Sequence, residues 1–377
     1  MRILVDYRAA LRARTGVGAY IHELIKAYTA AYAEDAVAVF TSSWKDRPAP
    51  TLGSELGATV VDTRIPVRVL NYLWHRAEWP SIETLAGAAD VAHSAHPLLL
   101  PARRAAQIVT IHDLFFLSHP ERTRAEIRRD YPALAADHAR RAHAIITSTQ
   151  HARRLVSDTF GISAEKIYVC SPGPPVWRTL GRKPNVPDAG TILFVGTLEP
   201  RKNIGALLDA YETLLTRMPA LPRLVLAGQA TADAEPWLAR LAAPPLAGRA
   251  VHLGYVADAA QEQLYADARV LVLPSLDEGF GLPALAAMSA GVPVIASRRG
   301  ALPEVVATGG ILFDPEQPGA LAAALERVIG DAAYAAAQGA AGLLRARAYD
   351  WSASAAVLRQ AYTDAIARRQ REAPRRS

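Results

Sequence analysis

The segment at residues 268–297, ARVLVLPSLDEGFGLPALAAMSAGVPVIAS, contains the pattern that decides the fold. An apolar run of strand length leads into a loop with two glycines, an alanine-rich run follows, and a second apolar run closes the segment. A strand, a helix and a strand in this order form a βαβ unit, which builds a parallel sheet. Pro283 and Gly291 are residue types that mark the start and the end of a helix. We therefore expect a helix over residues 283–290.

The same alternation of short apolar runs and alanine-rich segments continues along the whole chain, which indicates an α/β protein with parallel sheets. The expected strands of the first half are residues 3–5, 37–40, 59–61, 91–93, 108–111, 144–147 and 167–169. Those of the second half are residues 191–195, 223–227, 251–253, 270–274, 294–296 and 310–313. Each half is therefore expected to wind its own sheet.

Proline and glycine crowd residues 171–190, so neither a helix nor a strand is expected to run through that segment. At 377 residues the chain is also too long for one ordinary core. We expect domains at 1–170 and 191–350, with 171–190 as the linker. We expect residues 351–377 to form a helix that packs back on the first domain, followed by a short tail.

Composition restricts the environment of the protein. No stretch of about 20 residues lacks charged or strongly polar groups, so no transmembrane helix is expected. The start of the chain suits a first strand better than a signal peptide, because a charge interrupts its short apolar run. The single cysteine, Cys170, excludes an intramolecular disulfide and is expected to be a small core residue. These features favour a cytoplasmic protein.

The net charge of +6 favours an anionic partner. Arginines crowd one part of the first half: Arg122, Arg124, Arg128, Arg129, Arg140, Arg141, Arg153 and Arg154. Nucleic acid is the weakest candidate, because the chain has neither a helix-turn-helix pattern nor a basic groove interleaved with aromatic residues. A phosphorylated substrate, or peripheral association with the inner face of an anionic membrane, accounts better for this cluster.

The loop at 277–281 follows an apolar strand, and ligands of open parallel sheets bind at this end of the strands. Gly279 and Gly281 let a ligand approach the N–H groups of the helix start, where an anion is favoured. Glu278 would repel a phosphate, so a neutral polyol is its expected partner. A sugar diphosphate would satisfy both requirements. The alternative for Glu278 is an acid that interacts only with the helix dipole.

A second site signal lies in ILFVGTLEPRKNIGALLDAY, residues 192–211. Arg201 and Lys202 stand where a helix is expected to begin near Asn203, although cations at a helix start oppose the dipole. An anion held between them would explain their position. Gly196 lacks the further glycines of a dinucleotide or phosphate-loop motif, which argues against a nicotinamide-dependent dehydrogenase.

Together these motifs resemble the retaining glycosyltransferases of family 4, and the resemblance covers almost the whole chain. It rests on VGTLEPRKN, EGFGLPALAAM and GVPVIAS in the second half, and on RTGVGAYIHELI, DVAHSAHPLLLP and IVTIHDLFFLSHPE in the first. The first-half motifs look like the mannosyltransferase and rhamnosyltransferase branch. The resemblance implies the GT-B fold, in which two Rossmann-like doubly wound parallel-sheet domains face each other across a cleft.

The resemblance also implies roles for individual residues. Lys202 and Arg201 would bind the donor diphosphate, Glu278 would bind the donor sugar, and His112 would lie near that sugar and the reacting centre. Contacts to the donor are implied for Gly16, Gly18, Gly196, Val256, Gly279, Phe280, Gly281 and Leu282.

One residue departs from the family pattern. The second acid of the family's E-x7-E motif is replaced by Ala286, which puts donor affinity and nucleotide choice in question. His93 and His96 have a spacing that metal ligands can show, but no cysteine or clustered acid accompanies them. We therefore expect structural or acceptor-lining roles for both, with no metal and no cofactor.

The resemblance implies transfer of a hexose, mannose or a deoxyhexose such as rhamnose, from a nucleotide sugar to a hydroxyl of a growing glycan. A GDP-linked donor and a lipid-linked acceptor are favoured. The alternative is a protein that binds a sugar nucleotide with lost or weak turnover, for which Ala286 is the direct argument.

Overall fold

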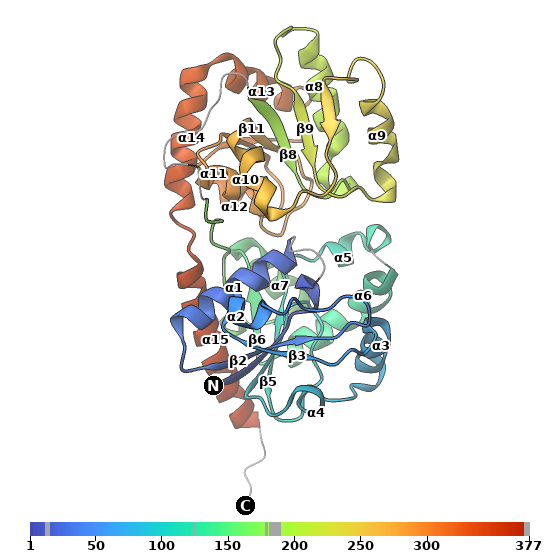
Figure 1. Ribbon diagram of the computed structural model, residues 1–377, viewed down its shortest axis with the longest axis vertical. Coiled ribbons are helices and arrows are strands. Elements are labelled where there is room, and N and C mark those ends of the chain that lie inside the picture. Colours follow the sequence, from blue (N-terminus) through green and yellow to red (C-terminus); the bar gives the residue numbers. More distant parts are fainter. Residues whose placement is uncertain (12–15, 124, 178–179, 181–189, 373–377) are drawn as a thin grey trace, which may run out of the picture. The chain divides into compact units, whose positions relative to one another are not determined.

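A computed structural model describes residues 1–11, 16–123, 125–177, 180 and 190–372 (Figure 1). The chain divides into two compact units. Unit 1 comprises Met1–Pro172 and Asp350–Ser377, and unit 2 comprises Gly173–Tyr349. Of the expected linker, residues 178–179 and 181–189 lie outside the described residues, as does the expected tail at 373–377.

Unit 1 contains a seven-stranded sheet in the order β3-β2-β1-β4-β5-β6-β7, and all of its pairs are parallel. Its strands are β1 (Arg2–Asp6), β2 (Ala36–Thr41), β3 (Thr59–Asp62), β4 (Val91–Ser94), β5 (Ala106–Thr110), β6 (Ala144–Thr147) and β7 (Ile167–Val169). The strand order reverses between β1 and β4. In open α/β sheets ligands bind at this switch point, beyond the carboxyl ends of the strands.

Helices lie on both faces of this sheet (Figure 1). They are α1 (Val17–Ala31), α2 (Leu52–Leu56), α3 (Val67–Ala77), α4 (Ile82–Ala86), α5 (Phe115–Ser118), α6 (Ala125–Arg141), α7 (Gln150–Phe160) and α15 (Trp351–Glu372). Short 3-10 turns are η1 (Arg8–Ala10), η2 (Pro120–Arg122) and η3 (Ala164–Lys166). The last helix, α15, packs against α1, β5 and β6, so the end of the described chain belongs to unit 1.

Unit 2 contains a six-stranded parallel sheet in the order β10-β9-β8-β11-β12-β13. Its strands are β8 (Thr191–Val195), β9 (Leu224–Ala227), β10 (Ala250–His252), β11 (Ala268–Leu273), β12 (Val294–Ser297) and β13 (Ile311–Phe313). The switch point of this sheet lies between β8 and β11. The loops that carry Arg201, Lys202 and Glu278 follow these two strands.

The helices of unit 2 connect its strands and cover the sheet. They are α8 (Ile204–Leu215), α9 (Glu235–Leu241), α10 (Asp258–Ala266), α11 (Leu282–Ser289), α12 (Leu302–Val306), α13 (Ala320–Gly330) and α14 (Ala332–Ala346), with 3-10 turns η4 (Pro200–Lys202) and η5 (Ala232–Ala234). No described helix of either unit is both long enough and apolar enough to cross a membrane.

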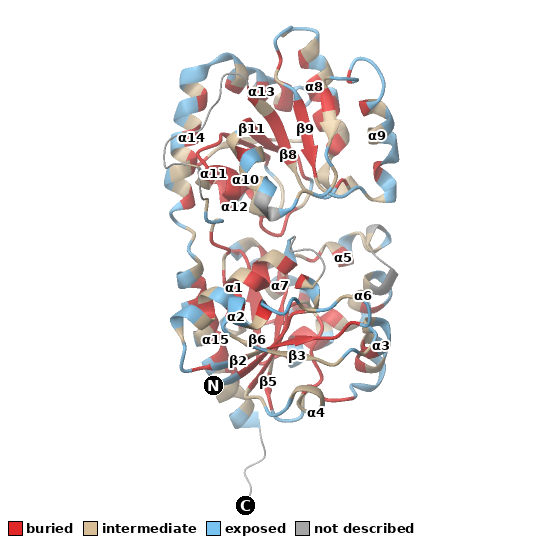
Figure 2. Cartoon of the chain, viewed as in Figure 1, coloured by how far each residue is buried: buried red, intermediate tan, exposed pale blue. Residues whose placement is uncertain are grey.

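The doubly wound parallel architecture expected from the sequence is confirmed. Each expected strand is present, with ends that match the expected ones or differ by at most two residues. In Figure 2 most strand residues of both sheets are red, whereas the helices are red on one side and pale blue on the other. The strands are buried by helices on both faces, which explains why they read as continuous apolar runs.

Helix α11 occupies the position expected for residues 283–290, one residue earlier at each end. Gly281 has a φ of 94° and serves as its N-cap, a left-handed conformation that glycine adopts at little cost. The helix ends before Gly291, whose φ is 73°. The short loop from β11 to α11 therefore ends in a glycine that turns the chain into the helix.

Candidate functional site

The candidate site in unit 2 is built from the two loops that follow β8 and β11. The Leu276 N–H donates to the Arg201 carbonyl at 2.7 Å, and the Asn203 side-chain amide donates to the Pro274 carbonyl at 3.2 Å. These bonds tie the loop after one strand to the loop after its neighbour. The charged residues of both loops are thereby held together at the switch point of the sheet.

Lys202 and Glu278 form an ion pair across these loops. Lys202 Nζ lies 2.5 Å from Glu278 Oε1, and the side chains are only 12% and 8% exposed. The Ser275 hydroxyl donates to the same oxygen at 2.8 Å. Burial alone would raise the pKa of Glu278, but the charges of Lys202 and Arg201 and the two hydrogen bonds hold that pKa below its ordinary value. The carboxylate is therefore ionised at neutral pH.

Arg201 is held in the same loop by an acid. Its Nε donates to Glu199 Oε1 at 2.6 Å, within the turn that contains η4. The sequence interpretation placed Arg201 and Lys202 at a helix start with an anion between them. In the structure both precede the N-cap residue Asn203 and both contact a carboxylate. An ammonium group has three donors, so Lys202 can contact Glu278 and an anionic ligand together.

A third loop, after β12, supports the backbone of Glu278. The Ala301 N–H donates to the Glu278 carbonyl at 2.9 Å. Gly300 has a φ of 58°, and a Cβ there would lie 2.5 Å from the Glu278 nitrogen. No larger residue fits this contact without moving the loop. Sequence reasoning missed both Gly300 and Ser275. For Gly300 the available signal was its position shortly after a buried strand.

Glycines also line the ends of the strands on the other side of β8. A Cβ on Gly228 would lie 2.0 Å from the Gly196 carbonyl oxygen, so the two backbones are in direct contact. The Gly228 N–H donates to the Gly254 carbonyl at 2.7 Å. Beside them Leu253 and Tyr255 are exposed, and Val256 is half-buried. The segment that includes Val256, for which a donor contact is expected, thus presents exposed apolar side chains just after the end of β10.

The residues at the start of α11 are close-packed. Gly279, Phe280 and Gly281 are buried, and a Cβ on Gly281 would lie 2.7 Å from the Leu302 side chain. The Phe280 ring meets the Tyr349 ring edge-on at 5.5 Å. This packing fixes the start of α11. Pro283 has no N–H, and the Ala284 N–H donates to the Gly281 carbonyl at 2.9 Å. In the described part of this turn, the Leu282 N–H is thus left for an anion.

Ala286 lies in the second turn of α11 and is 8% exposed. It belongs to the hydrophobic core of unit 2. Its carbonyl accepts a bond from the Ser289 hydroxyl at 2.8 Å, and that hydroxyl in turn accepts from the Trp177 indole N–H at 2.8 Å. The position where the family pattern has an acid is therefore packed against apolar neighbours.

In unit 1 the described part of the glycine-rich segment opens α1. Gly16 is the N-cap of this helix, with a φ of 51°, and its carbonyl accepts from the Tyr20 N–H at 3.0 Å. Gly16 is exposed and Gly18 is buried. Residues 12–15, which belong to the same motif, lie outside the described residues. A Cβ on Gly16 would have no described atom within 4 Å, so the described residues leave open space beside the start of α1.

His112 follows β5. Its Nε2 is buried, and no described residue forms a hydrogen bond with that nitrogen. Burial lowers the pKa of His112 to about 4, against a smaller opposing effect of the Asp113 charge, so the ring is neutral at pH 7. The imidazole meets the Tyr20 ring edge-on, with ring centres 4.7 Å apart. His112 thus presents a buried, neutral ring whose Nε2 has no hydrogen-bond partner among the described residues.

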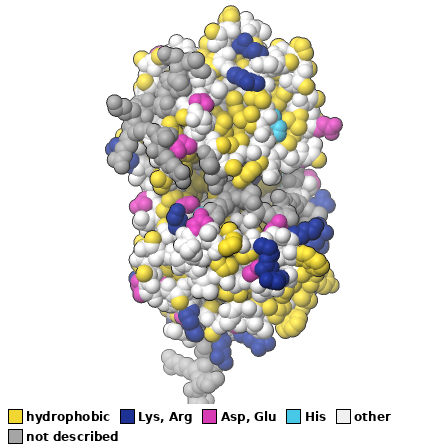
Figure 3. Space-filling view, in the orientation of Figure 1, with side chains coloured by type: hydrophobic (Ala, Val, Ile, Leu, Met, Phe, Trp, Pro, Cys, Tyr) yellow, Lys and Arg dark blue, Asp and Glu magenta, His cyan; other side chains and the backbone are white. Residues whose placement is uncertain are grey.

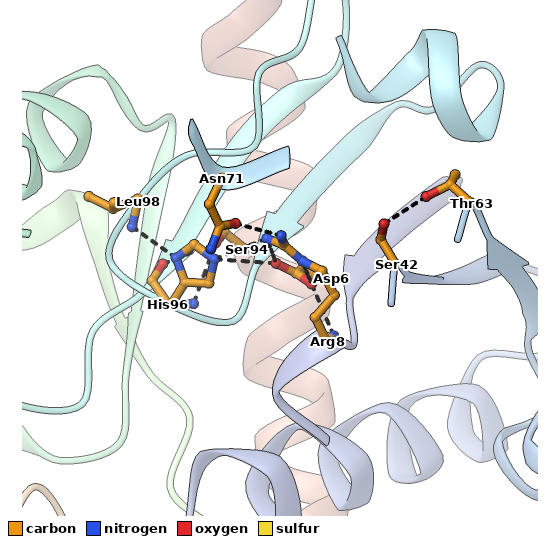
Figure 4. A network of polar contacts seen from close by, with 8 residues as sticks. All are labelled: Asp6, Arg8, Ser42, Thr63, Asn71, Ser94, His96 and Leu98. Carbon is orange, nitrogen blue, oxygen red and sulfur yellow. Dashed lines mark hydrogen bonds and ion pairs between the residues drawn. The ribbon is translucent and has the colours of Figure 1, made fainter. Parts of the chain in front are cut away.

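A polar network that sequence reasoning missed lies at the switch point of unit 1 (Figure 4). Asp6 ends β1 and accepts two bonds from the Arg8 side chain, at 2.9 and 2.7 Å, and one from the Arg8 backbone N–H at 3.0 Å. Arg8 also donates to the Asn71 side chain at 2.8 Å, and His96 Nε2 lies 3.3 Å from Asp6. The Arg8 charge is one of the causes that hold the pKa of Asp6 far below its ordinary value, although burial opposes this. This network fixes the two loops that follow β1 and β4.

His93 and His96, considered above for a metal, have other partners. His93 Nδ1 lies 2.8 Å from the Tyr362 hydroxyl, and its Nε2 lies 2.8 Å from the Thr110 hydroxyl. His93 therefore connects the sheet to α15. His96 Nδ1 accepts from the Leu98 N–H at 3.3 Å. Within the described residues, no three His, Cys, Asp or Glu side chains are grouped as a metal site requires.

Several arginines of the basic cluster have intramolecular partners. These are Asp130 for Arg129, Glu78 and Asp137 for Arg141, the Phe160 carbonyl for Arg140 and the Ala164 carbonyl for Arg153. Arg128 and Arg154 are exposed, and the described residues provide no side-chain partner for either. Figure 3 shows dark blue Lys and Arg side chains beside yellow hydrophobic ones on the face of unit 1 in view. The Arg122 side chain and all of Arg124 lie outside the described residues.

Two family models match the chain. The model described as Glycosyltransferase Family 4 matches residues 14–176, and the model described as Glycosyl transferases group 1 matches residues 189–331. The O-antigen chain mannosyltransferase B of Escherichia coli is 32% identical over 261 residues, which cover 67% of this chain and 68% of that protein. A D-inositol 3-phosphate glycosyltransferase of Corynebacterium glutamicum is 31% identical over 60% of this chain, and the match spans only 58% of that relative.

Solved structures with the same fold cover nearly the whole chain. Sucrose-phosphate synthase from Thermosynechococcus elongatus has a TM-score of 0.76 and 21% identity, covering 97% of this chain and 99% of that one. The Anabaena protein HepE, solved in complex with UDP and glucose, has a TM-score of 0.70 and 20% identity, covering 96% and 98%. At these identities the likeness establishes the fold.

Proposed function

The chain belongs to glycosyltransferase family 4, and we propose that it transfers a hexose from a nucleotide sugar to a hydroxyl group of a growing glycan. The hexose is mannose or a deoxyhexose such as rhamnose, and a GDP-linked donor is favoured. Support comes from the likeness to the O-antigen chain mannosyltransferase B. HepE, which shares the fold, was solved with UDP and glucose, which supports a nucleotide-sugar donor in general terms.

The observation that carries this proposal is the Lys202–Glu278 pair at the switch point of unit 2. A cation and an ionised acid are buried together at the end of the sheet where ligands bind. A sugar diphosphate needs both kinds of group, because its phosphates require cations and its hydroxyls require acceptors. Lys202 has donors left for a phosphate, and the described contacts of Glu278 use only Oε1. Oε2 is left for a sugar hydroxyl.

Stabilisation of the leaving diphosphate is the main contribution that this site would make to catalysis. Charge builds on the diphosphate as the bond to the sugar breaks. Lys202, Arg201 and the start of α11 would offset that charge, and such electrostatic stabilisation is usually the largest catalytic effect. Gly279, Phe280, Gly281 and Leu282 would contact the donor through their backbone. Gly196 would let the diphosphate approach the end of β8.

The transfer is proposed to retain the configuration of the sugar. In this mechanism the leaving diphosphate helps to deprotonate the acceptor on the same face of the sugar, so no enzymic nucleophile is needed. His112, neutral and with a buried unpaired Nε2, would accept or donate a hydrogen bond at a donor hydroxyl. The start of α1, at Gly16 and Gly18, would contact the diphosphate.

The base would lie at the segment that includes Val256, beside the exposed Leu253 and Tyr255. No metal and no further cofactor is proposed, because Lys202 and Arg201 provide the positive charge that a divalent ion would otherwise bring to the diphosphate.

The acceptor is proposed to be a lipid-linked cell-surface glycan of the lipopolysaccharide O-antigen kind, reached at the cytoplasmic face of the membrane. Arg128 is an exposed residue of α6, and Tyr72 is an exposed residue of α3. These two helices are neighbours, because His75 of α3 lies 2.9 Å from Asp130 of α6. Arginine and aromatic side chains on one surface suit the interface of an anionic membrane.

A second candidate function is supported by Ala286. A protein without the second acid of the motif could bind a sugar nucleotide with lost or weak turnover. Lys202, Arg201, Glu278 and the start of α11 would then serve binding alone. We rank this alternative below transfer, because Lys202, Arg201 and Glu278 are all present.

A donor screen tests the proposal. Purified protein is mixed with GDP-, UDP- and dTDP-linked sugars, and thermal unfolding is followed. A ligand at 100 times its Kd stabilises a protein by about 2.7 kcal/mol. We expect the midpoint to rise with one class of donor in the wild-type protein, and to rise much less in Lys202→Ala. The absence of any shift with every donor would contradict the proposal.

A further inference from the structure

Tyr20 is a buried aromatic residue of α1 that the proposed function does not use. It lies two residues after Gly18 and is 2% exposed. Its hydroxyl donates to the Cys170 carbonyl at 2.8 Å. A tyrosine whose hydroxyl is fixed in this way cannot change rotamer without leaving a buried carbonyl unpaired. The ring of Tyr20 is therefore a rigid surface inside unit 1.

Two aromatic rings pack against this surface. The His112 ring meets the Tyr20 ring at an interplanar angle of 86°, with centres 4.7 Å apart. The Trp351 ring of α15 lies 5.9 Å away at 51°. Perpendicular contacts between rings are favoured because the positive edge of one ring meets the negative face of the other. Tyr20 therefore connects three elements: α1, the loop after β5, and the start of α15.

His112 has no other fixed polar contact. No described residue forms a hydrogen bond with its imidazole, and its Nε2 is buried and unpaired. The torsion that turns an imidazole about its Cβ–Cγ bond has broad minima, so a histidine without hydrogen bonds depends on packing for its orientation. In the described part of unit 1, the Tyr20 ring is the aromatic group that provides such packing.

We propose that Tyr20 is a positioning residue for His112. It holds the neutral imidazole at the angle at which Nε2 meets a donor hydroxyl, and it does so from an anchor at the Cys170 carbonyl. This inference rests on the proposed function, in which His112 contacts the donor sugar. In this proposal Tyr20 itself contacts neither donor nor acceptor and acts only through His112.

The anchors of Tyr20 lie next to the two places where the chain passes between the units. Cys170 lies two residues before Pro172, where the first segment of unit 1 ends, and Trp351 directly follows Asp350, where the second begins. A change in the path of either segment alters the carbonyl or the ring that holds Tyr20. The orientation of His112 is thereby linked to both segments through a single side chain.

The test compares Tyr20→Leu and Tyr20→Phe with a matched control on the same helix. Tyr28 is also 2% exposed, and its hydroxyl also has a buried partner, Asp35 Oδ2 at 2.7 Å. Tyr28→Leu therefore removes a comparable buried ring from α1, but not the ring that contacts His112. We expect Tyr20→Leu to lower kcat by about 10- to 100-fold, since misplacing a reacting group by an ångström costs up to about 100-fold. Tyr20→Phe, which keeps the ring, should lose less than about 10-fold, and Tyr28→Leu should keep the wild-type kcat.

The donor KM separates positioning from general damage. Because most of the proposed donor contacts, Lys202 and Glu278 among them, lie in unit 2, the donor KM should change much less than kcat in both Tyr20 variants. A second readout is the pH titration of the His112 ring by NMR in the ligand-free protein. Removal of the covering ring in Tyr20→Leu should raise the pKa of His112 from about 4 towards its ordinary 6.5. This titration needs no activity, and Tyr20→Met, which also removes the ring, replaces Tyr20→Leu if that variant fails to fold.

A double-mutant cycle with His112→Ala decides between the outcomes. If Tyr20 acts through His112, Tyr20→Leu causes no further loss of kcat in the His112→Ala background. Equal losses in both backgrounds, or an unchanged His112 titration in Tyr20→Leu, would overturn the inference. Wild-type kcat in His112→Ala itself would instead refute the role that the proposed function gives to His112. The failure of one claim is thus distinguishable from the failure of the other.

Discussion

Replacement of Glu278 by glutamine removes one charge from the buried pair and leaves the shape of the side chain nearly unchanged. In the wild-type protein Glu278 accepts from Lys202 at 2.5 Å and from Ser275 at 2.8 Å, and the Lys202 and Glu278 side chains are 12% and 8% exposed. Removing one partner of a buried pair costs about 3 to 5 kcal/mol. In Glu278→Gln the amide oxygen still accepts both bonds, so we expect a smaller loss of about 2 to 3 kcal/mol in the free energy of unfolding.

Thermal unfolding measures this loss. Domains of 150 to 250 residues lose about 2 to 4 °C of Tm per kcal/mol, so the unfolding of unit 2 should shift down by about 4 to 12 °C at pH 7. Ser275→Ala is the matched control, because it removes one hydrogen bond to the same oxygen but no charge. Its Tm should fall by less than that of Glu278→Gln.

The difference in Tm should depend on pH. The pKa of Glu278 is lowered in the folded protein, so its ionised form adds stability above the ordinary value of 4.5, and this stability is lost as the pH falls through the lower folded pKa. Glutamine does not titrate at this position. The Tm difference between wild type and Glu278→Gln should therefore be largest at neutral pH and shrink in acid. Equal Tm values at pH 7, or a difference that stays constant into acid, would refute the reasoning.

Glu278→Gln should also separate binding of the diphosphate from transfer of the sugar. Lys202 keeps its charge in this variant, so calorimetric titration with a nucleoside diphosphate should give a Kd within about threefold of wild type. Transfer should fall by a larger factor, because the acceptor for a sugar hydroxyl becomes a neutral amide. A parallel loss of both would show that Glu278 acts on the diphosphate site as a whole.

Three further predictions concern the donor site and the surface of unit 1. Lys202→Ala should weaken transfer by about tenfold to a hundredfold without unfolding the protein, because a charge-assisted hydrogen bond contributes about 1.5 to 3 kcal/mol; turnover at the wild-type rate would refute this role. Ala286→Glu should lower the Tm, because the position is 8% exposed and close-packed, and in the folded protein it should tighten nucleoside diphosphate binding by about 1 to 3 kcal/mol if the new acid reaches unpaired ribose hydroxyls. Unchanged or weaker binding in a titration would show that the ribose is not presented to position 286. The protein should sediment with anionic liposomes in a salt-sensitive way, and Arg128→Ala with Arg154→Ala should reduce that binding, since each basic residue near an anionic surface adds about 1 kcal/mol. Equal sedimentation with neutral vesicles, or none with either, would contradict the membrane proposal.

The fold was predictable because both sheets are parallel and buried on both faces. Strands such as β8 and β11 therefore appear in the sequence as mostly apolar runs, with Thr191 and Arg269 as their polar residues, and glycines mark the turns that follow. Strand ends differed by a residue or two, since hydrogen bonding of the last residue depends on the neighbouring strand. In α11 the left-handed Gly281 places the helix start one residue before the position that Pro283 suggested.

The candidate site was predictable only in part. Arg201, Lys202 and Glu278 could be recognised by type and position, but the sequence does not reveal that Lys202 and Glu278 pair, since 76 residues separate them. Asp6 and Arg8 were missed because their burial and their contacts with Asn71 and His96, which lie far away in the sequence, arise only in the folded unit. Tyr20 lies within the RTGVGAYIHELI motif, but the sequence does not reveal that its ring contacts the His112 ring.

The most direct test of the account is transfer itself. Wild-type protein, Lys202→Ala and Glu278→Gln are incubated with each nucleotide sugar and a synthetic mannose-terminated lipid acceptor, and the product is followed by mass spectrometry. The account predicts that the wild type adds one hexose to the acceptor from one class of donor, and that both variants, still folded, lose most of this activity. Wild-type protein that binds the donor tightly but neither transfers nor hydrolyses its sugar would contradict the account and favour the sugar-nucleotide-binding alternative.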